Sequence, residues 1–91
     1  MKFTWSDAKR ATNQRMHGLD FADACWVFEG TTYTFEDDRF SYGEQRFVTL
    51  GLLHGIPVSI VHTETEYEIR IVSFRKATGR EAKIYFSEIR Y

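Results

Sequence analysis

The chain has 91 residues, of which 43% are hydrophobic, so residues 1–91 fit a single small domain with one core. The formal net charge of −1 excludes a protein that coats nucleic acid with its whole surface. A lone cysteine, Cys25, excludes an internal disulfide, and the first residues lack the apolar core of a signal peptide. We therefore expect a cytoplasmic protein without a membrane span.

The first part of the chain predicts one strand followed by two helices. The strand covers residues 2–5, and Ser6 with Asp7 caps a helix that runs to about Met16 and ends at Gly18. Asp20 then caps a second helix over residues 21–28. Apolar residues at i, i+3, i+4 and i+7 predict its buried face, which comprises Phe21, Ala24, Cys25 and Phe28.

The second part of the chain predicts four strands and a closing helix. The strands cover residues 32–35, 46–53, 58–63 and 67–74, with a turn at 54–57, and the acidic run 36–38 is expected to be a solvated loop. Residues 78–81 form a capping box for the last helix, whose expected buried face comprises Ala82, Tyr85, Phe86 and Ile89. The order β-α-α-β-β-β-β-α predicts an α+β fold, a small antiparallel sheet with two N-terminal helices and a C-terminal helix against it.

Positive charge is concentrated near the end of the chain. Residues 1–45 hold five Lys and Arg against eight Asp and Glu, whereas residues 46–91 hold seven against five. Arg70, Arg75, Lys76 and Arg80 fall within eleven residues, and the last three surround the N-terminus of a predicted helix. A helix N-terminus favours anions, and guanidinium groups bind phosphate well. The cluster therefore predicts a phosphate site, and RNA is the expected ligand.

Arg70 and Arg75 are an odd number of residues apart, so regular strand alternation puts them on opposite faces of the sheet. They share a site only if the strand ends or bulges near Ser73. Two interpretations of Arg70 remain open: an ion-pair ladder with Glu68 on the surface, or a side chain that projects toward a phosphate.

Three other residues are candidates for chemistry. Glu44 and Arg46 face the same way at the start of a strand. If the strand has already begun at Glu44, they are either a plain ion pair or a general base beside a guanidinium that stabilises developing negative charge. His17, at a helix C-terminus, either caps carbonyl groups or has a functional role as a proton donor or a phosphate contact. His62 is expected to be an edge or core residue. The histidines and Cys25 lack metal-ligand spacing, so neither a metal nor a cofactor is expected.

Several ordered segments resemble the BrnT family of type II toxins, small ribonucleases with a RelE-like fold. These segments are residues 3–9, 13–21, 27–28, 38–46 and 69–81, together with Tyr85. The resemblance spans nearly the whole chain. The chain departs from the family pattern at Met16, where a basic residue is usual, and at Phe74, where a small residue is usual.

The resemblance implies a ribonuclease toxin of the cytoplasm that is neutralised by an antitoxin similar to BrnA. In that family the antitoxin carries the DNA-binding domain, so operator DNA is reached only through the complex, which can hold a toxin dimer within a hetero-tetramer. We hypothesise metal-free cleavage of RNA. The expected catalytic residues are Glu44, Arg46, Arg70 and Arg75, and the expected substrate-binding residues are His17, Lys76 and Arg80. The alternative is a non-catalytic module that binds protein or RNA on a decayed toxin fold.

Overall fold

The computed structural model describes residues 1–39, 41 and 43–90. In chain order its elements are β1 (Lys2–Thr4), α1 (Asp7–His17), the 3₁₀ turn η1 (Phe21–Asp23), α2 (Ala24–Glu29), β2 (Tyr33–Glu36), β3 (Phe47–Leu53), β4 (Ile56–Glu64), β5 (Glu68–Lys76) and α3 (Gly79–Glu88). This order confirms the predicted α+β fold. No helix among the described residues is long and apolar enough to cross a membrane.

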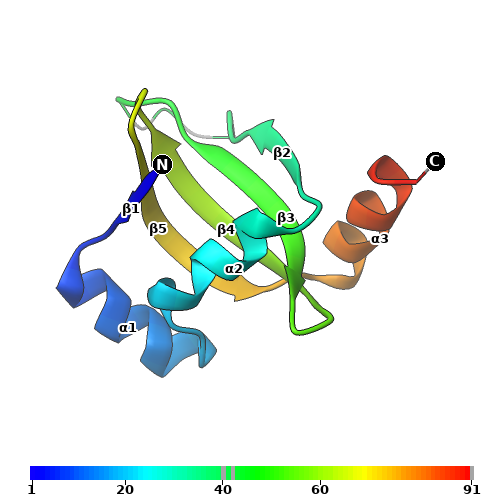
Figure 1. The fold of residues 1–91 in the computed structure, drawn as a ribbon, viewed down its shortest axis with the longest axis horizontal. Helices are drawn as coiled ribbons and strands as arrows, with labels where there is room; N and C mark the ends of the chain where they lie inside the picture. The colour runs from blue at the N-terminus through cyan, green and yellow to red at the C-terminus, as the bar shows by residue number, and fades with distance from the viewer. Residues whose placement is uncertain (40, 42, 91) are drawn as a thin grey trace.

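The five strands form one sheet in the order β1-β5-β4-β3-β2. The pairs β2–β3, β3–β4 and β4–β5 are antiparallel, as predicted, but β1 runs parallel to β5, so the sheet is mixed. Between β1 and β2, α1 and α2 carry the chain across the sheet from one edge to the other (Figure 1). The hairpin pattern of the sequence describes only neighbours in the chain, and therefore it could not indicate this long-range parallel pairing.

Helices cover both faces of the sheet. On one face α1, η1 and α2 pack on a core of nine buried residues: Phe21, Ala24, Val27, Leu53, Val58, Ile60, Ile69, Ile71 and Phe74. On the other face α3 packs on a smaller core of Val48, Leu50 and Tyr85. Figure 1 shows α1 and α2 in front of the sheet and α3 at the right of the view, beside β3 and next to the C-terminus. We call the face of the sheet that carries Val48, Leu50 and α3 the α3 face.

The buried faces of α2 and α3 differ in part from the prediction. Residues 21–23 form a 3₁₀ turn with about three residues per turn, so Ala24 follows Phe21 into the core, and Val27 is the next buried residue in α2. Cys25 is only partly buried as a result. On α3 Tyr85 is buried as predicted, whereas Phe86 is 51% exposed, because this helix covers only one corner of the sheet.

Caps and turns set the ends of the elements largely as predicted. Ser6 accepts a hydrogen bond from the N–H of Lys9 at the start of α1, and Gly18 ends the helix with a left-handed φ of 71°. The β3–β4 turn is shorter than predicted. His54 and Gly55, with φ of 49° and 80°, form the whole two-residue turn, because positive φ at both positions matches the twist of a hairpin. Residues 56 and 57 already belong to β4.

Candidate functional site

β5 contains a bulge in the middle of its pairing with β4. Val61 is opposite Ser73 and the next residue, His62, is opposite Ile71, so Val72 is an extra residue in β5. A bulge of one residue reverses the alternation of side chains along the strand. A bulge near Ser73 is what Arg70 and Arg75 require in order to lie on one face of the sheet, and β5 contains one.

Core packing on the two sides of the bulge confirms the reversal. Ile71 before it and Phe74 after it both lie in the core under α1 and α2, although an odd number of residues separates them. Regular alternation would place Phe74 on the opposite face from Ile71, and the bulge brings both residues to the same face. Arg70 and Arg75 consequently both project from the α3 face.

Arg46 lies on the same face at the start of β3. It is two residues before the buried Val48, and its carbonyl accepts a hydrogen bond from the N–H of Asp37 at 2.8 Å, which extends the β2–β3 pairing. Its guanidinium is 3.8 Å from the carboxylate of Glu44, whose side chain is 57% exposed. Phe47, the residue after Arg46, is opposite His62 of β4. The next residue of β4, Thr63, is opposite Arg70 of β5. Arg46 and Arg70 therefore lie on either side of β4 at the same end of the sheet.

Arg75 is oriented by a carboxylate of α3. Its Nη1 and Nη2 donate to the two oxygens of Glu81 at 2.7 and 3.0 Å, and Nη1 also donates to the carbonyl of Lys76 at 3.1 Å. The same carboxylate caps α3 by accepting from the N–H of Thr78 at 2.9 Å. Burial favours a higher pKa for Glu81, but the hydrogen bonds from Arg75 and Thr78 outweigh it and lower the pKa below its ordinary value.

This pairing leaves one edge of the Arg75 guanidinium available. An arginine has five N–H donors, and the Glu81 and Lys76 contacts use three of them. The other two, on Nε and Nη2, lie side by side along the outer edge of the group. That edge matches two oxygens of a phosphate. Arg75 can thus remain bonded to Glu81 and still bind an anion.

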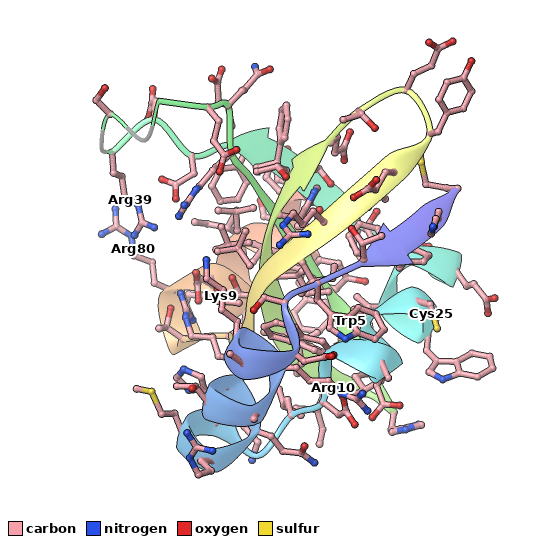
Figure 2. The ribbon with its side chains drawn as sticks, turned by 90° about the vertical axis from the view of Figure 1, so that its left-hand side faces the viewer. Trp5, Lys9, Arg10, Cys25, Arg39 and Arg80 are labelled. Carbon is pink, nitrogen blue, oxygen red and sulfur yellow. The ribbon has the colours of Figure 1, made fainter. Side chains whose placement is uncertain are left out.

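A hollow of about 380 Å³ adjoins Arg75 between α3 and the sheet. Its lining comes from β2 and the following loop, from β3, β4 and β5, and from α3, and comprises Phe35, Glu36, Asp37, Asp38, Arg39, Val48, Ser59, Val61, Arg75, Arg80, Glu81 and Ile84. Figure 2 shows the guanidinium groups of Arg39 and Arg80 beside each other at the edge of the molecule, and both line this hollow. Of the residues that the sequence predicted to form the site, Arg75 and Arg80 therefore both line this hollow.

The acidic run before the hollow is not uniformly solvated, in contrast to the prediction. The side chain of Asp37 is only 2% exposed, and its two oxygens accept hydrogen bonds from Arg39 at 2.8 and 3.0 Å. A buried carboxylate is stable only when it is paired. Asp37 therefore holds Arg39 against the hollow, whereas its neighbours Glu36 and Asp38 are exposed as predicted.

Two predicted substrate-binding residues lie elsewhere. His17, at the end of α1, lines a separate groove with Val72 and Ser73 at the edge of β5. Lys76 is two residues after Phe74, so it faces the α1 side, and it is exposed. The structure does not bring His17 or Lys76 together with Arg75, because α1 covers the opposite face of the sheet.

The sequence did not predict the place of two residues in the site, Glu81 and Ser59. Glu81 was predicted as a capping residue, but its pairing with Arg75 depends on the chain folding back between β5 and α3. Its position, six residues after an arginine near the end of a strand, was the available signal. Ser59 gave no signal, since a serine within an apolar strand is unremarkable in sequence. Among residues 1–39, 41 and 43–90, no three His, Cys, Asp or Glu side chains are grouped where they could hold a metal ion.

Comparison with known proteins identifies the family of the chain. The family model described as "Ribonuclease toxin, BrnT, of type II toxin-antitoxin system" matches residues 5–81. The match includes Arg46, Arg70, Arg75 and Arg80, and it ends in the first turn of α3. No curated protein matches the chain. Since the model matches well over half of the sequence, the resemblance found in the sequence is confirmed: the chain belongs to the BrnT family of type II ribonuclease toxins.

Proposed function

We propose that this toxin cleaves RNA on the α3 face of its sheet, with the scissile phosphate bound by Arg70 and Arg75. The observation that carries the proposal is the bulge at Val72, since it turns both guanidinium groups to one face of a rigid strand. The free edge of Arg75 supports it, because two parallel N–H groups recognise phosphate bidentately. Arg46 lies on the same face and supplies a further positive charge.

The proposed chemistry uses protein side chains, the RNA itself and a proton from solvent. A base removes the proton of a 2′-hydroxyl, whose oxygen attacks the adjacent phosphorus, and the bond to the 5′-oxygen breaks. The products are a 2′,3′-cyclic phosphate and a 5′-hydroxyl, whose proton comes from solvent at this open face. We assign Glu44 as the base, because its carboxylate lies beside Arg46 at the end of the sheet that carries Arg70. The arginines stabilise the negative charge of the phosphorane.

His17 and Lys76 have no part in this mechanism. Both lie on the α1 side of the sheet, so neither reaches a phosphate held between Arg70 and Arg75. Arg80 remains a substrate-binding residue, because it lines the hollow beside Arg75 and no described residue pairs with it.

The experiment is cleavage of an end-labelled RNA by the purified toxin and its variants. Removing one charge-stabilising group costs on the order of 10²–10³ in rate, so Arg70→Ala and Arg75→Ala should each cleave that much more slowly. Arg15→Ala, on exposed α1, is the matched control and should cleave like the parent. Activity should persist in EDTA, and the ends should be 2′,3′-cyclic phosphate and 5′-hydroxyl. Unchanged cleavage by both variants, with folding verified, would sink the assignment.

A type II toxin has an antitoxin partner, and we propose one similar to BrnA, acting with the toxin in the cytoplasm. We further propose that operator DNA is bound through the antitoxin and that the complex contains a toxin dimer within a hetero-tetramer. The net charge of −1 supports DNA binding through the antitoxin, because a toxin that bound DNA by itself would carry a net positive charge. Gel shifts with toxin alone and with the co-purified complex test the DNA contact, and light scattering tests the stoichiometry.

A further inference from the structure

The hollow beside Arg75 has walls unlike those of a simple phosphate site. Its volume of about 380 Å³ falls within the range of small-ligand sites. Val48 and Val61 of the sheet form its floor with Ser59, and Phe35 and Ile84 add apolar surface from β2 and α3. These four apolar side chains offer contact surface to an organic ring, and the charged residues of the lining surround them.

The charges that line the hollow do not favour an anion inside it. Three carboxylates, on Asp37, Asp38 and Glu81, accompany three guanidinium groups, on Arg39, Arg75 and Arg80, whereas Glu36 pairs with Phe47 and its side chain therefore projects from the opposite face. Two pairs are already bonded to each other, Asp37 with Arg39 and Glu81 with Arg75. A phosphate in the interior would therefore meet no excess of positive charge. A neutral group with both donors and acceptors fits better.

Ser59 supplies a polar contact that the described residues leave unused. Its side chain is part of the lining, yet the residue is only 1% exposed and its Oγ has no hydrogen-bond partner among the described residues. Buried hydroxyl groups in folded proteins are normally bonded. Ser59 lies in β4, between Leu50 of β3 and Arg75 of β5, so its position is rigid. A polar ring edge seated in the hollow would complete this hydrogen bond.

Arg80 places an unused positive charge at the mouth of the hollow. It is exposed, no described residue bonds to it, and its guanidinium lies beside that of Arg39 (Figure 2). Asp37 already pairs with Arg39, so it is the charge of Arg80 that no described carboxylate pairs with at this position. A phosphate attached to a group inside the hollow would lie at this position.

We propose that the hollow binds one unpaired nucleobase of the RNA, next to the phosphate that is cleaved. The apolar side chains contact the ring faces, Ser59 bonds the polar edge of the base, and Arg80 binds the phosphate of that nucleotide. A base in a duplex cannot enter such a hollow without leaving its stack, so the substrate class is single-stranded or looped RNA. The inference rests on the ribonuclease site proposed above and deepens it.

The test is a titration of the isotope-labelled toxin, followed by amide NMR, with each of the four nucleoside 3′-monophosphates. Ribose 5-phosphate serves as the probe without a base. At least one nucleotide should shift the amides of Val48, Ser59 and Val61, and ribose 5-phosphate should not. Ser59→Ala removes one hydrogen bond and should weaken nucleotide binding about three- to tenfold. Ser87→Ala, the same change at an exposed site on α3, should leave the affinity unchanged.

Equal binding of ribose 5-phosphate, or an unchanged affinity in Ser59→Ala, would overturn the base site. Assays of RNA cleavage by the toxin and its arginine variants distinguish the nucleobase site from the catalytic role of Arg70 and Arg75. If Arg70→Ala and Arg75→Ala lose cleavage while no nucleotide shifts Ser59, the catalytic face stands and the base site is wrong. If nucleotides bind as expected while both arginine variants cleave normally, the base site stands and the catalytic assignment is wrong.

Discussion

The side-chain amide of Asn13 in α1 bonds both backbone groups of Phe74 in β5. Its Oδ1 accepts from the Phe74 N–H at 3.1 Å, and its Nδ2 donates to the Phe74 carbonyl at 2.7 Å. β1 pairs with β5 only over residues 68–70, so beyond that point a side chain takes the place of a neighbouring strand. Asn13 thereby fixes the segment that leads from the bulge at Val72 to Arg75.

Asn13→Ala should destabilise the fold strongly. It leaves two buried backbone groups of Phe74 unpaired, and each such group costs about 1–3 kcal/mol, so the free energy of unfolding should fall by about 2–4 kcal/mol. Urea denaturation measures this. Gln14→Ala, at the next and exposed position of α1, should change it by less than about 0.5 kcal/mol. Equal stability of the two variants would show that the Asn13 contacts do not support β5.

Glu81→Gln should separate helix capping from the orientation of Arg75. A glutamine still accepts the cap hydrogen bond of Thr78, so α3 should remain folded, but the charged pairing with Arg75 is lost. We expect kcat for RNA cleavage to fall about tenfold, since Arg75 no longer holds its edge toward the phosphate. In an Arg75→Ala background the same change should have no further effect, because Glu81 acts through Arg75. An equal loss in both backgrounds would refute this positioning role.

Gly51→Ala should destabilise the packing of α2 on β3. A Cβ at Gly51 would lie 2.6 Å from Cγ1 of Val27 and 3.3 Å from Cγ2 of Thr32, so side chains must shift. Overpacking of this kind costs about 1–3 kcal/mol, which should lower the Tm by several degrees. Gly79→Ala is the matched control, because nothing lies within 4 Å of its Cβ, and it should leave the Tm unchanged or slightly raised. A Tm for Gly51→Ala equal to that of the control would contradict this packing.

His62 should make stability depend on pH in the mildly acidic range. The residue is fully buried between Phe28 and Phe47, and its Nε2 is bonded to Thr49 at 2.7 Å. Burial lowers the pKa of His62 from 6.5 to about 4. The unfolded chain therefore binds a proton between these pH values and the folded chain does not. Stability should be full above about pH 6.5 and fall by about 3 kcal/mol toward pH 4.

Urea denaturation at pH 7.5 and pH 5 measures this dependence, with His62→Phe as the control that cannot titrate. Glu64 is the acidic group that faces the ring, at 3.4 Å from Nδ1, and it would counteract the loss by pairing with a protonated ring. The parent should lose more stability than His62→Phe over this interval. Parallel losses in both proteins would mean that His62 is not the group responsible.

Local sequence patterns predicted most of the secondary structure. The capping box at Thr78 and Glu81 was visible because its hydrogen bonds join residues three apart. The Gly18 cap follows from the backbone of a single residue. The buried face of α2 was misjudged at Cys25 because a 3₁₀ turn and an α-helix have similar sequence signals but different periods.

The site was predicted only in part. Arg75 and Arg80 belong to one charged segment, and the structure places both at the same hollow. Lys76, between them in the sequence, faces the other way because neighbouring residues of a strand alternate. Glu44, Arg46, Arg70, Arg75 and Arg80 remain predictions as functional residues, and the variants described above test them.

The sequence by itself determined the family, the α+β class, the caps and the concentration of guanidinium groups near the C-terminus, because each depends on residues close together in the chain. The tertiary structure alone decided which of these groups share a surface. The bulge at Val72 arises where β4 and β5 pair, and no pattern within β5 specifies it. The parallel contact of β1 with β5 and the bond from Asn13 to Phe74 likewise join residues more than sixty positions apart. Such contacts form through packing across the whole sheet, so they lie outside the reach of local propensity and alternation.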